Sequence, residues 1–251
     1  NGCGIPKDLH VETQEGQPHL VEVYDEDEKE CIEEAVEIAK TCDIAIIVGG
    51  DNTFTSSEGH DRADLKLPGK QRELIKAVAK TGKPVVLNIM AGRSLVLDFE
   101  IEHSDAILYS FHPGTMGGPA IAQLIFGDET PSGKTPVTFP KHVGQIPLYY
   151  NHNMTGRPAN GREELLHEIP LKAGQTSLGM TSYWLDCPFA PEFPFGYGLT
   201  YTTFKYSAPE IERTEYGVND TVHACVTVRN TGDKEATEVV QLYVRDIVRS
   251  V

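Results

Sequence analysis

A long polar loop stands out because its residue types could carry acid–base chemistry. Residues 49–62 read GGDNTFTSSEGHDR and directly follow the apolar run 44–48. The charged and ionisable side chains near its end are Glu58, His60, Asp61 and Arg62. Gly59 permits unusual backbone angles beside Glu58, and an arginine can orient a carboxylate or bind a polar substrate. The residues alone are consistent with a catalytic loop and also with a solvated connection between a strand and a helix.

The elements that must position this loop alternate between helix and strand up to about residue 150. The expected helices begin at 25, cover 68–81 and cover 117–126, and the expected strands are 44–48, 85–90 and 106–110. This order predicts an α/β fold, a mainly parallel sheet flanked by helices. The run 44–48 is apolar throughout, as expected of a strand covered on both faces. Ligands in such folds bind at the carboxyl ends of the strands, where loops 49–62, 91–93 and 111–114 are expected to lie.

The pattern changes after residue 150. Residues 151–192 are rich in Gly, Pro, Asn and aromatic residues and show little periodicity. From Thr200 onward, runs with a period of two appear at 200–208, 222–228 and 239–244, separated by turn residues. They predict the start of an antiparallel β-sandwich, cut short near the end of the chain.

Composition excludes several classes of function. The chain has 251 residues and a formal net charge of -15, which disfavours nucleic acid and anionic membranes. No apolar run approaches the ~20 residues of a membrane span. The segment 131–135, PSGKT, lacks the upstream glycine and the following helix of a phosphate-binding loop. Histidines and cysteines do not recur at metal-ligand spacing, so no metal or cofactor is expected, and most cysteines are expected to be buried free thiols.

Ordered stretches along nearly the whole chain match a known family. The matching stretches are 57–62 (SEGHDR), 64–71 (DLKLPGKQ), 82–86 (GKPVV), 112–120 (HPGTMGGPA), 126–128 (FGD), 144–147 (GQIP), 155–158 (TGRP) and 193–204 (FPFGYGLTYTTF). With these stretches the chain resembles the C-terminal part of glycoside hydrolase family 3, the β-glucosidase and β-xylosidase family. The resemblance implies an α/β sandwich domain at 1–150 that lacks its start, an irregular connector at 151–192, and a partial fibronectin type III-like domain at 193–251.

The resemblance also implies a division of labour. Glu58 matches the acid/base carboxylate, with Arg62, Asp61 and His60 as expected substrate-binding residues and no metal. The nucleophilic Asp of this family lies on an N-terminal (β/α)8 barrel, which is absent from this chain, so the chain is expected to be inactive alone. The implied substrate is an oligosaccharide or β-glycoside ending in glucose or xylose, and the implied location is periplasmic or secreted.

The residue types alone leave other assignments of the acid/base residue and of the function open. Asp61 and Asp51 are the nearest other candidates for the acid/base. A chain with a single catalytic carboxylate is also consistent with a non-catalytic carbohydrate-binding or structural fragment.

Overall fold

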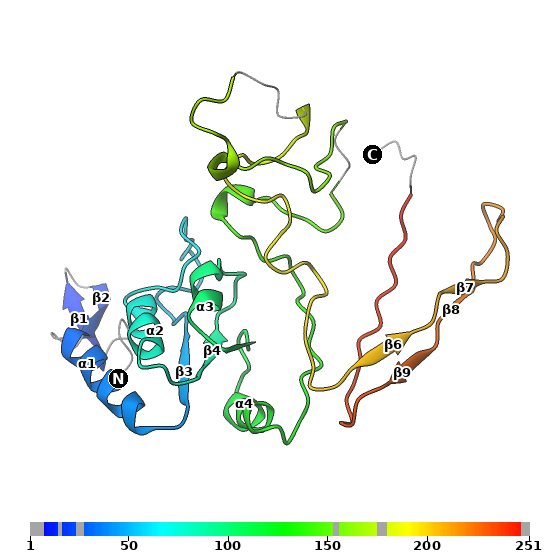
Figure 1. The fold of residues 1–251 in the computed structure, drawn as a ribbon. Helices are drawn as coiled ribbons and strands as arrows, with labels where there is room; N and C mark the ends of the chain where they lie inside the picture. The colour runs from blue at the N-terminus through cyan, green and yellow to red at the C-terminus, as the bar shows by residue number, and fades with distance from the viewer. Residues whose placement is uncertain (1–7, 15–16, 24–27, 153–155, 175–179, 247–251) are drawn as a thin grey trace. The chain divides into compact units, whose positions relative to one another are not determined.

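The computed structural model describes residues 8–14, 17–23, 28–152, 156–174 and 180–246 (Figure 1). The chain divides into two compact units, which are considered separately here. One comprises Asn1–Gly114 with Val137–Pro194, and the other comprises Thr115–Pro136 with Phe195–Val251. The domain boundaries expected at residues 150 and 192 remain predictions.

The first unit is built around a parallel sheet, as expected. Its strands are β3 (Ala45–Gly50), β4 (Val85–Met90) and β5 (Ala106–Tyr109), in the order β3-β4-β5. Its helices are α1 (Glu28–Thr41), α2 (Gln71–Ala79) and α3 (Asp98–Glu102). In the register, Val48 pairs with Asn88 and Asn88 with Leu108. Since both pairings are parallel, all three strands end at one edge of the sheet.

The core of this unit lies on one face of the sheet. Leu87 and Ile89 of β4 are fully buried and pack in one cluster with Ile75 of α2. A second cluster joins Val85 to Val78 of α2 and Ala39 of α1. Because successive strand residues point to opposite faces, these contacts place α1 and α2 over the same face. The burial of α2 follows from the helical spacing of its apolar residues.

Several expectations about this unit need correction. Helix α2 begins at Gln71 rather than Pro68, since Lys70 has a non-helical backbone. Strand β3 is not covered on both faces, because Ile46 and Val48 are 41% and 54% exposed. They belong to the edge strand and alternate with Ile47, whose side chain packs into the core.

Other findings were not anticipated or fall outside the described residues. The antiparallel hairpin of β1 (Asp8–Gln14) and β2 (Gln17–Val23) was not predicted. The expected helix start at residue 25 lies outside the described residues.

The remaining part of the first unit is mostly irregular, as expected of a connector. It contains two short 3-10 turns, η1 (Val143–Gln145) and η2 (Leu166–Glu168). Cys187 in this region is buried, whereas Cys225 in the second unit is exposed. Cys31 and Cys42 are partly exposed, so the expectation that most cysteines are buried is wrong for the described residues.

The second unit contains one helix and short antiparallel strands. Helix α4 spans Gly117–Phe126. Strand β6 (Phe204–Tyr206) pairs with β9 (Val228–Asn230), and β7 (Glu210–Ile211) pairs with β8 (Ala224–Cys225). The antiparallel pairing was predicted, but the expected strand at 239–244 is wrong, because residues 239–244 pair with no described strand.

Candidate active site

The polar loop begins at a close approach between two strands. Gly50 ends β3 with φ of 140°, and a Cβ there would lie 1.8 Å from the carbonyl oxygen of Met90. Only glycine fits such a position, because it has no Cβ and tolerates positive φ. The next residue, Asp51, donates its backbone N–H to the same carbonyl at 2.9 Å. Asp51 is therefore held at the carboxyl edge of the sheet.

Gln71 fastens the far end of the loop to its start. The Gln71 side chain donates from Nε2 to the carbonyl oxygen of Gly50 at 2.9 Å and accepts the Gly50 N–H at 2.8 Å. The side chain is buried, and both hydrogen-bonding groups of its amide are satisfied. The first residue of α2 thus closes the segment between Gly50 and α2 into a loop with a fixed base.

Inside this loop, Asp51 joins two arginines. Its side chain is 0% exposed, and its Oδ1 accepts from Arg62 Nη1 at 2.8 Å and from the Thr55 hydroxyl at 3.1 Å. Arg93 Nε lies 3.4 Å from Oδ2, which accepts no hydrogen bond. Arg62 and Arg93 are 19% and 23% exposed. A buried carboxylate requires such charged partners, since an isolated buried charge is very unfavourable.

Glu58 lies on a turn at the outer part of the loop. The turn spans residues 57–60 and is closed by the His60 N–H donating to the Ser57 carbonyl at 3.1 Å. Gly59 has φ of 74° at its third position, the conformation that a type II turn requires there. The Glu58 side chain is exposed and makes no hydrogen bond or ion pair with any described residue. The turn therefore leaves this carboxylate available to a ligand.

The other predicted site residues are arranged differently. Asp61 is exposed like Glu58. His60 Nδ1 lies 3.2 Å from the carbonyl oxygen of Thr53, within the loop. Arg62 points inward, because its guanidinium donates to Asp51 and to the carbonyl of Lys66. Substrate binding by these residues remains a prediction, and Arg62 already has protein partners for its charge.

The loops after all three strands meet beside Asp51. Arg93 follows β4, and a Cβ on the preceding Gly92 would lie 2.7 Å from Nε2 of His112, which follows β5. The Tyr109 hydroxyl, at the end of β5, donates to the Arg93 carbonyl oxygen. Burial, more than any other factor, raises the pKa of Tyr109, so this hydroxyl keeps its proton. The sequence placed these loops together correctly.

Sequence reasoning missed the residues that hold the loop. Arg93 appeared only as part of a polar loop, and Asp51 only as an alternative acid. One usable signal was their position, because each lies within a few residues of the end of a parallel strand.

No metal-binding group was found in the described ranges, which leave out, for example, residues 1–7 and 175–179. Among the described helices, none is both long and apolar enough to cross a membrane.

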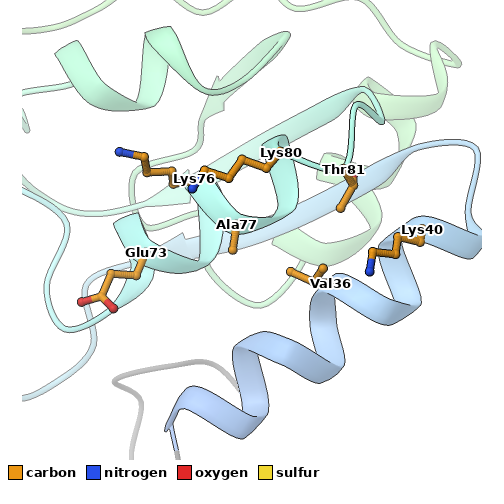
Figure 2. A pocket seen from close by; sticks show the side chains of 7 residues that line it. All are labelled: Val36, Lys40, Glu73, Lys76, Ala77, Lys80 and Thr81. Carbon is orange, nitrogen blue, oxygen red and sulfur yellow. The ribbon is translucent and has the colours of Figure 1, made fainter.

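A hollow of about 440 Å³ lies between α1 and α2 (Figure 2). Its lining residues are Val36, Lys40, Glu73, Lys76, Ala77, Lys80 and Thr81. Lys40, one of its cations, already pairs with Glu37 at 2.5 Å. The hollow is lined by residues of α1, of α2 and of the two positions after α2, and it includes no residue of the polar loop, so the loop stays the candidate site.

The chain matches a known family along most of its length. Residues 6–201 match the family description "Glycosyl hydrolase family 3 C-terminal domain". The chain is 43% identical over 220 residues to a periplasmic β-glucosidase of Salmonella typhimurium, covering 88% of this chain and 27% of that protein. It is 39% identical over 225 residues to a β-xylosidase of Formosa agariphila, covering 89% of this chain and 28% of that protein.

A solved structure gives the same result. The chain superimposes on a variant β-glucosidase of Listeria innocua, in complex with laminaribiose, with a TM-score of 0.76 and 34% identity. The match covers 91% of this chain and 29% of that one. The chain belongs to glycosyl hydrolase family 3 and corresponds to its C-terminal domain. It spans less than a third of the length of each of these relatives.

Proposed function

We propose that this chain is the part of a retaining β-glycosidase that supplies the acid/base carboxylate, Glu58. The single observation that carries the assignment is the position of Glu58. It is an exposed carboxylate on a turn of a loop whose base is fastened at the carboxyl edge of the sheet. Membership of family 3 supports the reaction class.

The chemistry needs two carboxyl groups, ~5–5.5 Å apart in retaining enzymes. A nucleophilic carboxylate attacks the anomeric carbon while the bond to the leaving oxygen breaks. Glu58 donates its proton to that oxygen. In the second step Glu58 takes a proton from water, and the water oxygen attacks the anomeric carbon and releases the nucleophile. The nucleophile comes from outside this chain, on the barrel domain that the family resemblance implies.

The other acids of the loop suit these steps less well. The carboxylate of Asp51 is fully buried and bound by Arg62, so it offers no proton to a substrate at the surface. Asp61 is exposed, but it lies beyond the turn and next to Arg62, which points inward. These contacts favour Glu58 as the acid/base and leave Asp61 as the nearest comparison.

The proposed substrate is a β-glycoside that ends in glucose or xylose. Names of similar proteins support this class, since they include β-glucosidases and a β-xylosidase. The choice between the two sugars depends on contacts to the sugar ring, which the proposal assigns largely to the barrel domain.

The test is Glu58→Ala in the full-length enzyme that contains this chain. A cellobiose-like substrate needs protonation of its leaving oxygen, so its turnover should fall by roughly 10²–10⁴-fold. An activated aryl glycoside should still complete its first step and then accumulate the glycosyl-enzyme. Added azide should restore turnover of the aryl glycoside as the glycosyl azide, because azide attacks without deprotonation.

Asp61→Ala is the matched control, since it removes another exposed carboxylate from the same loop. It should change the turnover of both substrates by the same factor, and azide should not restore activity. If Glu58→Ala lowers both substrates equally and azide does nothing, Glu58 is not the acid/base. If Asp61→Ala shows the leaving-group dependence instead, the role belongs to Asp61.

A further inference from the structure

The Arg93 side chain hydrogen-bonds to the backbone on both sides of Glu58. Arg93 Nη2 donates to the carbonyl oxygen of Thr55 at 2.9 Å and to that of His60 at 3.4 Å. These carbonyls lie on either side of Glu58 in the chain. A guanidinium can bind both carbonyls through Nη2 while its Nε faces Asp51, because its donors are held in one rigid plane. The backbone on both sides of Glu58 is thereby tied to the loop after β4.

Asp51 in turn holds Arg93 and Arg62. It holds Arg62 and the Thr55 hydroxyl through hydrogen bonds to Oδ1, and it faces Arg93 across 3.4 Å at Oδ2. The carboxylate is 0% exposed and, among the described ion pairs, contacts two arginines. If its negative charge were removed, both guanidiniums would lie beside a neutral side chain and lose the one carboxylate with which each forms a described ion pair. Such removal is strongly unfavourable and would release the arginines from their present positions.

We infer that Asp51, in its anionic form, is the positioning residue of the acid/base loop. It fixes Arg93 and Arg62, and Arg93 fixes the carbonyls that flank Glu58. Asp51 does not contact the reacting atoms. The inference rests on the proposed function, in which Glu58 serves as acid/base. A carboxyl group displaced by about 1 Å loses much of its catalytic effect, so the network governs how well Glu58 reaches the leaving oxygen.

The chain offers a matched control at a different site. Glu100 is also 0% exposed and is bound by one arginine, Arg72, with both contacts at 2.8 Å. Arg72 is 19% exposed, like Arg62. Glu100 lies on α3 and Arg72 on α2, and neither side chain makes a described contact with residues 49–62. Glu100→Gln therefore removes a buried, arginine-bound charge without touching the proposed positioning network.

The experiment compares Asp51→Asn with Glu100→Gln in the full-length enzyme. Both substitutions are expected to lower the denaturation midpoint. Asp51→Asn should also lower kcat for a cellobiose-like substrate by about 10²-fold. The rate of the first step on an activated aryl glycoside should fall by less than about 10-fold, and KM should be nearly unchanged. Glu100→Gln should leave the ratio between the two substrates at the wild-type value.

A second variant covers the case in which Asp51→Asn does not fold. Arg93→Lys keeps a positive charge near Asp51 but removes the Nη2 group that binds the carbonyls of Thr55 and His60. It should show the same dependence on the leaving group, to a smaller extent. If the folded variants behave like Glu100→Gln, the inference about Asp51 is overturned. If Glu58→Ala lowers activity equally on the cellobiose-like and the activated aryl substrate, the proposed function itself is contradicted, independently of the role of Asp51.

Discussion

At the scale of single residues, Tyr109 links the hydrophobic core to the candidate site. Its ring contacts Phe111 and Phe139 edge to face, with both centroids 4.9 Å away. Its hydroxyl donates to the carbonyl oxygen of Arg93. The aromatic cluster thus fixes the position of a hydroxyl that in turn fixes the backbone of the loop after β4.

Tyr109→Phe should preserve the ring contacts and remove the hydrogen bond to Arg93. We expect the free energy of unfolding of the chain to fall by about 1 kcal/mol, because a carbonyl loses its partner. Urea denaturation at neutral pH measures this difference. A variant as stable as the wild type would show that the Arg93 carbonyl finds another donor.

The difference should also depend on pH. Burial raises the pKa of Tyr109 above its ordinary value of 10.0. Above that pH the unfolded chain releases this proton while the folded chain keeps it, so the wild type loses stability as pH rises. The Phe variant lacks this contribution, so the difference in stability between wild type and variant should narrow as the pH rises from about 10 to about 11. A gap of constant size over this range would contradict the assignment.

At the scale of elements, the ends of β3 and β4 are closer together than side chains allow. Gly50 meets the Met90 carbonyl at the point where a Cβ would sit, and Gln71 of α2 occupies both backbone groups of Gly50. The end of one strand, the end of its neighbour and the start of a helix are therefore fixed together. The polar loop leaves from this junction and returns to it, so its base cannot shift along the sheet.

Gly50→Ala should destabilise the chain by about 3 kcal/mol or more, since it adds backbone strain to a clash with a main-chain carbonyl. Gly144→Ala is the matched control, because a Cβ at Gly144 has nothing within 4 Å. The control should change stability by less than about 1 kcal/mol. Equal thermal midpoints for Gly50→Ala and the wild type would mean that the strand ends separate in solution.

At the scale of the whole molecule, the match to the β-glucosidase from Salmonella typhimurium covers 88% of this chain but only 27% of that protein. The proposed reaction needs a second carboxylate, and the proposal places it in another part of a longer protein. Glu58 by itself can donate or accept a proton but cannot form the glycosyl-enzyme.

We therefore expect the isolated chain to show no turnover of aryl β-glucosides. Release of the aryl alcohol by the purified chain measures this, with the full-length enzyme as the positive control. The Glu58→Gln form of the isolated chain is the negative control. Turnover by the isolated chain that disappears in Glu58→Gln would mean that a carboxylate of this chain, such as Asp61, acts as the partner of Glu58.

The sequence by itself determined the family and the alternation of α2 with strands β3, β4 and β5, but not the hairpin of β1 and β2. Helical and strand periodicity are local, so β4 at Val85–Met90 and α4 at Gly117–Phe126 could be predicted with their bounds. Local patterns were less reliable where the formation of a strand depends on pairing with another strand. The run 239–244 alternates like a strand, but it has no described strand to pair with.

Only the tertiary structure decided which polar residues of the loop face inward and which are exposed. Asp51, Arg62 and Glu58 are all charged residues of one loop, yet Asp51 is buried, Arg62 turns toward it and Glu58 is exposed. That choice depends on Arg93, which the pairing of β3 with β4 brings beside Asp51 from a distant part of the chain. Strand pairing and register depend on contacts between distant residues, and a local reading of residue types does not contain them.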